Sequence, residues 1–264
     1  MEQRKPPWLK KSINFKAQHE VQALLSSLHL NTVCSEASCP NRGECFKNKT
    51  ATFMILGENC TRNCRFCTVS KGKVMPLDPN EPENVAKAAK ELGLKHVVVT
   101  SVTRDDLPDN GAGHFAETIK QIRKYLPQST VEVLIPDFQG DYDSLKIVID
   151  QKPEIINHNI ETVKSLYDEV RPMDVYKRSL ELLRRVKDSK TGIYTKSGVM
   201  VGLGETKEQI EELMDDLLEA GCDILTIGQY LQPSKQHIDV KEYVTPEQFD
   251  EYKKIGLAKG FKYI

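Results

Sequence analysis

Six of the seven cysteines fall into two triplets within one short stretch of the chain. The triplets are Cys34-x4-Cys39-x5-Cys45 and Cys60-x3-Cys64-x2-Cys67. Buried free cysteines scatter with the hydrophobic pattern, whereas metal ligands recur at short, loop-sized spacings. The two triplets therefore predict two metal centres. Cys222 stands apart at the start of an apolar run, and we expect it to be a small buried core residue.

The second triplet has too few ligands for a closed metal site. A structural zinc ion takes four tetrahedral ligands, and this triplet supplies three. Iron–sulfur clusters use thiolates at similar spacings, and a 4Fe–4S cluster held by three cysteines leaves one iron for a ligand from elsewhere. We favour such a cluster with a small molecule on its open iron. Zinc, completed by His29 or another of the six histidines, is the alternative.

The elements that must position these cysteines begin near Thr50. Short apolar or β-branched runs alternate there with helical patterns in six units. The predicted strands are 53–56, 97–99, 131–135, 155–160, 199–203 and 224–227. This alternation predicts a parallel sheet. An eight-fold barrel takes about 250 residues, so we expect an α/β fold with an open, partial (β/α)6 TIM-like barrel. A doubly wound sheet is the alternative.

Helix signals support these units. Thr206 and Gln209 predict a capping box, and Gly221 predicts the end of that helix. Thr245 with Pro246 predicts the start of the last helix, Pro82 and Gly93 bracket another, and residues 17–30 predict a short helix before the first triplet.

Parallel α/β folds place their chemistry at the C-terminal ends of the strands. The second triplet follows the first predicted strand, and the other strand ends run into small or polar residues. These include Ser101, Asn159, Glu161, Gly202 and Glu205. Asn159 and Glu161 have the plainer interpretation of helix caps, and Gly202 that of a tight turn.

Two arginines after the fourth predicted strand, Arg171 and Arg178, either pair with a carboxylate or lie on a solvated helix face.

The composition of the chain argues against two classes of function, nucleic-acid binding and membrane insertion. A net charge of −1, with 28% charged and 39% hydrophobic residues, is typical of an ordinary globular protein, so we expect no nucleic-acid partner. The N-terminus lacks an apolar signal region, and no run approaches the roughly 18 apolar residues of a membrane helix. We therefore expect a cytoplasmic protein without a membrane partner, whose thiols stay reduced and free for metal.

Two regions follow from these patterns. Residues 1–49 form an N-terminal extension that carries a basic arm and the first triplet, and residues 50–264 form the partial barrel. The arm, residues 1–16, has five Lys or Arg residues against Glu2. It is either a solvated tail or a strip that docks an acidic partner.

The motifs resemble a known superfamily. Cys60-x3-Cys64-x2-Cys67 after a first strand resembles the radical S-adenosylmethionine (SAM) enzymes, and Gly198-x-Met200-x-Gly202-x-x-Glu205 is similar to their Gly-x-Ile-x-Gly-x-x-Glu segment. Within that superfamily the chain resembles the lipoyl synthase family over nearly its whole length. The segments that carry this resemblance are 33–45, 100–107, 157–163 and 228–234.

The resemblance implies an activity and its cofactors. Two sulfur atoms would replace hydrogens at C6 and C8 of an octanoyl chain on a carrier lysine. Cys60, Cys64 and Cys67 would hold the 4Fe–4S cluster that cleaves SAM to a 5′-deoxyadenosyl radical. An auxiliary 4Fe–4S cluster on the first triplet would supply the sulfur. The implied SAM contacts are Ser101, Asn159, Glu161, Gly202 and Glu205.

The resemblance also implies three partners: an octanoylated lipoyl-carrier domain or protein, a reductant protein such as flavodoxin or ferredoxin, and an iron–sulfur carrier protein. If the carrier has an acidic face, the basic arm would steer it. Family members usually continue into an Arg-Ser-Ser-Tyr segment whose serine completes the auxiliary cluster. This sequence ends at Ile264, so we expect only three protein ligands there.

Two other functions are also compatible with the sequence. One is a biotin-synthase-like radical SAM enzyme that inserts sulfur into a free small molecule, against which the first triplet argues. The other is a non-catalytic iron–sulfur or zinc protein. Six β/α units far exceed what holding a cluster requires.

Overall fold

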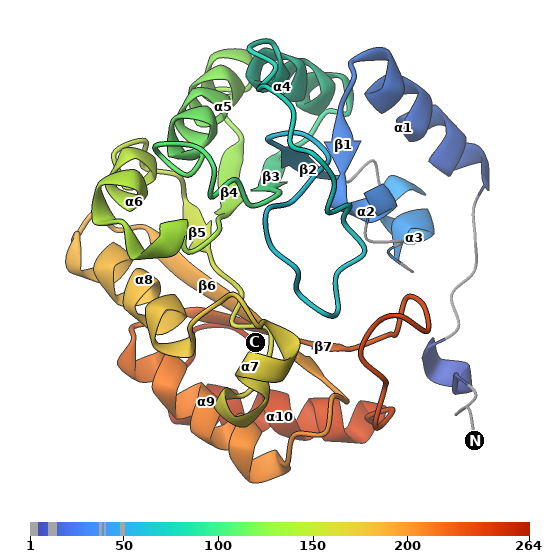
Figure 1. The fold of residues 1–264 in the computed structure, drawn as a ribbon, viewed down its shortest axis with the longest axis vertical. Coiled ribbons are helices and arrows are strands. Elements are labelled where there is room, and N and C mark those ends of the chain that lie inside the picture. The colour runs from blue at the N-terminus through green and yellow to red at the C-terminus, as the bar shows by residue number, and fades with distance from the viewer. Residues whose placement is uncertain (1–4, 10–14, 37–38, 40, 48–50) are drawn as a thin grey trace. The chain divides into compact units, whose positions relative to one another are not determined.

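A computed structural model of the chain describes residues 5–9, 15–36, 39, 41–47 and 51–264 (Figure 1). The chain divides into two compact units. The N-terminal unit comprises residues 12–62 and 68–157, and the C-terminal unit comprises residues 1–11, 63–67 and 158–264. Most of the predicted basic arm, including the side chains of Arg4, Lys10, Lys11 and Lys16, lies outside the described residues.

The N-terminal unit contains a ladder of strands in sequence order. They are β1 (Asn31–Thr32), β2 (Thr52–Ile55), β3 (His96–Ser101), β4 (Thr130–Leu134) and β5 (Ile155–Asn157). Strands β2 to β5 are parallel, as predicted, with Phe53 opposite Val99 and Val99 opposite Val133. Strand β1 pairs antiparallel with β2. It was not predicted, because a two-residue strand is too short to show periodicity.

Helices cover the outer side of this ladder, where Figure 1 shows α4, α5 and α6 beside β2 to β5. The helices of this unit are α1 (Phe15–Ser27), α2 (Val33–Glu36), α3 (Arg42–Lys47), α4 (Glu81–Glu91), α5 (Ala112–Tyr125), η2 (Phe138–Gly140) and α6 (Tyr142–Ile149). The apolar stripe of α4, with Val85, Ala88 and Ala89, is fully buried. Its burial confirms that the helical periodicity marks the core-facing side.

The C-terminal unit has two parallel strands, β6 (Tyr194–Val201) and β7 (Ile224–Gln229), with Val199 opposite Ile227. Its helices are η1 (Pro7–Leu9), η3 (Lys164–Leu166), α7 (Tyr167–Val170), α8 (Tyr176–Asp188), α9 (Lys207–Glu219) and α10 (Pro246–Lys259). A core cluster of Val170, Leu203, Tyr230 and Ile238 lies beyond the strand ends. It packs against Phe66 of the second triplet, so this core supports the cysteine loop directly.

The predicted helix caps are confirmed. Thr206 accepts a hydrogen bond from the Gln209 backbone N–H at 3.3 Å, and the Gln209 side chain accepts one from the Thr206 N–H at 2.9 Å. Thr245 caps α10 through the N–H of Gln248. Each cap satisfies amide donors that the first helical turn leaves unpaired.

Strand boundaries around β5 and β6 differ from the prediction. Strand β5 ends at Asn157, and β6 begins at Tyr194 rather than near Val199. The segment after β5 instead lies along β6, where the Glu161 N–H donates to the Gly198 carbonyl at 2.9 Å and the Met200 N–H donates to the Glu161 carbonyl at 2.9 Å. Helices of membrane-spanning length and hydrophobicity are absent from the residues described.

Candidate functional site

The first cysteine triplet follows β1, the edge strand of the N-terminal ladder. Cys34 is buried in α2, directly after β1, and Cys45 lies in α3. The Cys39 N–H donates to the Cys34 carbonyl at 3.2 Å. Burial raises the pKa of the Cys34 thiol, a backbone hydrogen bond from Thr52 opposes that rise, and the charges of Cys39 and Cys45 add to it.

Cys60 sits in the loop that follows β2. Leu56 and Gly57 end the strand with φ values of +72° and +93°. The Cys60 N–H then donates to the Ser70 carbonyl at 2.8 Å. Its sulfur accepts hydrogen bonds from the N–H of Thr103 at 3.3 Å and the N–H of Arg62 at 3.4 Å. These bonds fix the side chain at the C-terminal end of the strand, where the sequence predicts it.

Cys64 and Cys67 belong to the C-terminal unit and share a tight turn. The Cys67 N–H donates to the Cys64 carbonyl at 3.2 Å, and the His237 ring Nε2 lies 3.2 Å from the Cys67 carbonyl. The Arg65 N–H donates to Val170, and the Arg65 carbonyl accepts from the Ile238 N–H. The turn is therefore held by segments more than a hundred residues away in sequence.

Among described residues, no three His, Cys, Asp or Glu side chains cluster tightly enough to ligate a single metal ion.

Cys64 lies beside a buried ion pair. Its sulfur is 3.7 Å from Oδ2 of Asp174, and Asp174 pairs with Arg171 at 2.9 Å. Burial raises the pKa of the Cys64 thiol to about 12. Arg171 opposes that rise, and Asp174, Cys67 and Glu161 add to it. The free thiol is therefore protonated at neutral pH, and a bound cation has to displace its proton.

Arg171 is buried, so the interpretation as a solvated helix residue was wrong for it. Its Nη1 donates to the Asn159 carbonyl and to the Tyr167 hydroxyl, both at 2.9 Å. Arg178, by contrast, is partly exposed on α8. Asp174 and His237 were not identified from the sequence, because neither belongs to a spacing motif and both reach the cysteines only through the folded chain.

Asn159 and Glu161 come together on the segment that lies along β6. The Asn159 side chain hydrogen-bonds to the Glu161 carboxylate, and burial raises the pKa of Glu161 while Arg171 opposes that rise. The N-cap of the next helix is Val163, so these two side chains do not cap it. A Cβ on Gly198 would lie 2.7 Å from Asn159 Oδ1, so glycine there leaves room for the amide.

Gly202 and Glu205 form the turn after β6. The Glu205 carboxylate accepts hydrogen bonds from the N–H groups of Gly202, at 2.5 Å, and Leu203, at 2.9 Å. Gly202 has a φ of +94°, and a Cβ there would lie 2.3 Å from the Glu242 carbonyl oxygen. The geometry matches the plainer interpretation of a tight turn.

Several buried polar atoms near the strand ends have unused hydrogen-bonding capacity. Within the described part of the chain, Ser101 Oγ in the N-terminal unit and Asn159 Oδ1 in the C-terminal unit have no hydrogen-bond partner. Buried polar groups in native proteins are generally satisfied. Their chemistry, a hydroxyl and an amide oxygen, fits a polar nucleoside or amino-acid ligand. Three soft thiolates likewise fit an iron–sulfur cluster.

Cys222 is a buried core residue, as predicted, with 3% of its surface exposed.

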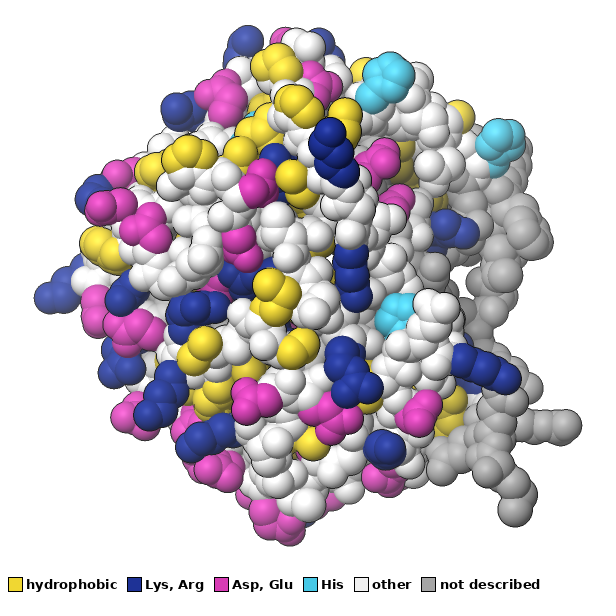
Figure 2. Space-filling model, viewed as in Figure 1, with side chains coloured by type: hydrophobic (Ala, Val, Ile, Leu, Met, Phe, Trp, Pro, Cys, Tyr) yellow, Lys and Arg dark blue, Asp and Glu magenta, His cyan; other side chains and the backbone are white. Residues whose placement is uncertain are grey.

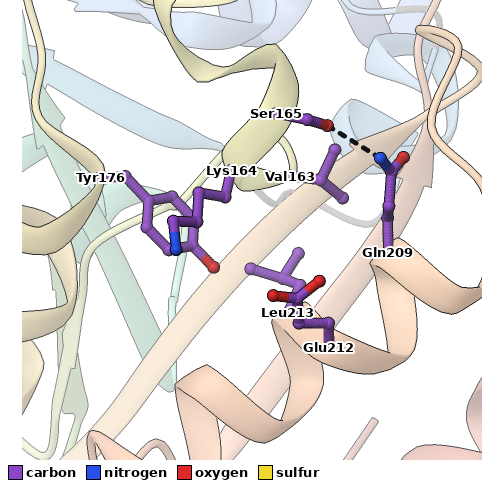
Figure 3. Close-up of a pocket in the computed structure, with 7 residues that line it drawn as sticks. All are labelled: Val163, Lys164, Ser165, Tyr176, Gln209, Glu212 and Leu213. Atoms are coloured by element: carbon purple, nitrogen blue, oxygen red, sulfur yellow. Dashed lines mark hydrogen bonds between the residues drawn. The ribbon is translucent and has the colours of Figure 1, made fainter.

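The C-terminal unit also has a pocket of about 320 Å³ that none of the predicted site residues lines (Figure 3). It is lined by Val163, Lys164, Ser165, Tyr176, Gln209, Glu212 and Leu213. Gln209 Nε2 donates to Ser165 Oγ at 3.0 Å across one side of it.

On the molecular surface, acidic and basic side chains are interspersed over the face drawn in Figure 2, in keeping with the net charge of −1.

Comparison with known proteins identifies relatives over nearly the whole chain. A family model described as the radical SAM superfamily matches residues 54–217. The lipoyl synthase of Caldanaerobacter subterraneus subsp. tengcongensis is 58% identical over 261 residues, which cover 99% of this chain and 92% of that protein. The lipoyl synthase of Alkaliphilus metalliredigens is 54% identical over 267 residues, covering 99% of this chain and 90% of that protein.

A solved structure supports the fold independently. The crystal structure of methylornithine synthase matches 96% of this chain and 72% of its own with a TM-score of 0.61, at 14% identity. A likeness at that identity concerns the fold alone. Together with the family match and the six strands β2 to β7, each of which precedes a helix, it confirms the predicted α/β partial barrel.

Proposed function

The chain belongs to the lipoyl synthase family within the radical SAM superfamily, and we propose on that premise that each of its two cysteine triplets holds a 4Fe–4S cluster. The chain is a radical SAM sulfurtransferase, which replaces hydrogens at C6 and C8 of a protein-bound octanoyl chain with sulfur. Identity over nearly the whole chain favours this reaction over a biotin-synthase-like one and over a non-catalytic metal protein.

Cys60, Cys64 and Cys67 are proposed to hold the cluster that binds SAM. When bound, that cluster and SAM supply the radical that removes hydrogen from an unreactive saturated carbon. Support comes from the spacing of the three cysteines, the N–H groups directed at the Cys60 sulfur and the place of Cys64 beside the buried Asp174. The chain's own residues position the three cysteine side chains. Their thiol groups lose their protons when the cluster binds.

SAM recognition is proposed for polar side chains in both units. The unpaired Ser101 hydroxyl and the Asn159 amide oxygen would hydrogen-bond SAM, and Glu161, held by Asn159, would accept from its hydroxyl groups. The guanidinium of Arg171 would offer positive charge to a carboxylate. Gly202 and Glu205 would lie beside the adenine of SAM. The Glu205 carboxylate would hold the turn by accepting hydrogen bonds from the N–H groups of Gly202 and Leu203.

Cys34, Cys39 and Cys45 are proposed to hold an auxiliary cluster that supplies sulfur. The observations that support this proposal are the Cys34-x4-Cys39-x5-Cys45 spacing and the hydrogen bond from the Cys39 N–H to the Cys34 carbonyl beside edge strand β1. Residues 1–49 then act as a cluster-binding extension of the barrel that spans residues 50–264.

The reaction needs an octanoylated carrier and an electron donor. For the donor we propose flavodoxin or ferredoxin, and for rebuilding the auxiliary cluster we propose an iron–sulfur carrier protein. A cytoplasmic location is proposed because iron–sulfur ligands of this kind require reduced thiols.

A single anaerobic assay tests the assignment. The protein is reconstituted with iron and sulfide and then incubated with SAM, a reductant and an octanoyl-lysyl peptide, and the products are analysed by mass spectrometry. We expect wild type to form 5′-deoxyadenosine and add sulfur to the peptide. A variant with all three cysteines of the second triplet changed to Ala should form neither product.

The first-triplet variant separates the two clusters. With Cys34, Cys39 and Cys45 changed to Ala, the protein should still form 5′-deoxyadenosine but leave the peptide without added sulfur. Cys222→Ala is the matched control and should keep both activities. Sulfur insertion by the first-triplet variant would contradict the auxiliary-cluster assignment, and wild type without 5′-deoxyadenosine would contradict the radical mechanism.

A further inference from the structure

Arg62 carries a buried positive charge two residues after Cys60. Only 4% of its side chain is exposed. A buried guanidinium is costly unless anionic partners and hydrogen bonds satisfy it. The partners of Arg62 therefore reveal what this charge contributes to the loop.

The partners come from two different strand ends of the N-terminal unit. Arg62 Nε and Nη2 donate to the two carboxylate oxygens of Asp105, after β3, at 2.8 and 2.9 Å. Its Nη2 also donates to Oδ1 of Asp137, after β4, at 2.6 Å. Asp137 is itself fully buried and accepts a hydrogen bond from the Gln139 N–H at 3.1 Å. One guanidinium thus joins the loops after β2, β3 and β4.

Thr61 reinforces this junction from the backbone side. The Thr61 N–H and hydroxyl both donate to the Thr103 carbonyl, at 3.0 and 3.1 Å. The Thr61 hydroxyl also accepts from the Asp105 N–H at 3.1 Å. The loops after β2 and β3 are therefore also held together by hydrogen bonds at Thr61, the residue before Arg62.

The consequence appears at the Cys60 sulfur. Both N–H groups that donate to it, from Arg62 and Thr103, belong to the loops that the guanidinium joins. Hydrogen bonds to a ligating thiolate orient it and stabilise negative charge on it, which influences both the retention and the reduction potential of a cluster.

We propose that Arg62 is a positioning residue for the SAM-binding cluster, because its buried junction with Asp105 and Asp137 holds two backbone N–H donors on the Cys60 sulfur. This inference rests on the proposed assignment of Cys60 as a cluster ligand. The fork matters as much as the charge, since a lysine offers a single ammonium where arginine spans two carboxylates.

The test uses the full chain with Cys34, Cys39 and Cys45 changed to Ala, so that only one cluster remains. In that background Arg62→Gln, Arg62→Lys and Asp137→Asn are compared with Arg65→Gln. Arg65 lies in the same loop but is half exposed and pairs with Glu169 at 3.4 Å. Iron and sulfide content, the rate of cluster loss to a chelator and the midpoint potential from an EPR-monitored titration are measured. Circular dichroism of each apo variant checks folding.

We expect Arg62→Gln to lose its cluster about tenfold faster than the background, the usual scale for removing a group that orients a metal ligand. Its midpoint potential should move to a more negative value, because the reduced cluster loses hydrogen bonds. Arg62→Lys and Asp137→Asn should change both quantities in the same direction, and Arg65→Gln should change neither.

The outcomes separate the inference from the site assignment. If the background protein binds no cluster, both the site and the inference are overturned. If it binds one and the Arg62 variants match it in loss rate and potential, only the role of Arg62 is overturned. Should Arg62→Gln fail to fold, Arg62→Lys decides the question.

Discussion

At the scale of single residues, Cys222 shows how strongly burial alone changes a thiol. It is 3% exposed, and its sulfur donates to the Ile224 carbonyl at 3.3 Å. Burial raises the pKa of this thiol to about 12, from an ordinary value of 9.0. Cys64 reaches a similar pKa beside an ion pair. Two cysteines with similar acidity thus sit in unlike settings.

The Cys222 thiol makes stability depend on alkaline pH. Its pKa is higher in the folded state, so the unfolded chain binds fewer protons above about pH 9 and the thiol's contribution is lost as pH rises toward about 12. The free energy of unfolding of the apo protein should therefore fall more steeply between pH 9 and 11 in wild type than in Cys222→Ala. Urea titrations followed by circular dichroism measure both curves. Parallel curves would show that Cys222 titrates alike in both states.

The residues that the sequence predicted best are those with fixed spacing. The placement of Cys60 after the first predicted strand followed from spacing and period alone, and the structure confirms it. That the two triplets bind metal stays a prediction. The contacts of Asp174 and Arg62 could not be predicted in this way. Asp174 meets Cys64 across 110 positions of chain, and Arg62 meets Asp137 across 75. Single-sequence patterns carry no information about such distant pairs.

At the scale of elements, the end of β6 depends on one backbone conformation. Gly202 adopts a φ of +94°, with the Glu242 carbonyl 2.3 Å from where a Cβ would be. Residues other than glycine are strained at such angles. Gly228, in the neighbouring strand β7, has open space around its Cβ position.

This pair gives a matched test of the turn. Gly202→Ala should lower the free energy of unfolding by more than about 1 kcal/mol, because strain and a backbone clash act together. Gly228→Ala should change it by less than about 1 kcal/mol. Chemical denaturation of both variants measures the difference. Equal effects would mean that the turn relaxes without cost.

The element predictions succeeded where local signals were strong. The capping box at Thr206 and the Thr245 cap place α9 and α10 correctly, since a cap is a short-range interaction. The boundary between β5 and β6 was misjudged, because residues 158–161 pair with β6 through tertiary contacts that no local period reveals. Strand β1 was not predicted, because two residues are too few to show a strand periodicity.

At the scale of the whole molecule, bound clusters should stabilise the fold. A ligand that binds only the folded state adds stability by mass action. Reconstituted wild type should therefore unfold at a higher temperature than the chelator-treated apo protein. The first-triplet alanine variant should show a smaller increase, because it keeps one cluster.

Differential scanning calorimetry under anaerobic conditions measures these midpoints. Cys222→Ala is the control, and its increase on reconstitution should equal that of wild type. If apo and reconstituted wild type unfold at the same temperature, the clusters do not contribute to folding stability.

The pairing of β1 with β2 has a consequence for the order of synthesis. Chains leave the ribosome from the N-terminus at about 5–20 residues per second. All five strands of the ladder from β1 to β5 lie before residue 158, whereas β6 and β7 come later. A nascent chain that has just released β5 already contains the first cysteine triplet and the edge strand that tethers it. Strand β6 begins at Tyr194, after 36 further residues (158–193), and β7 and α10 follow it.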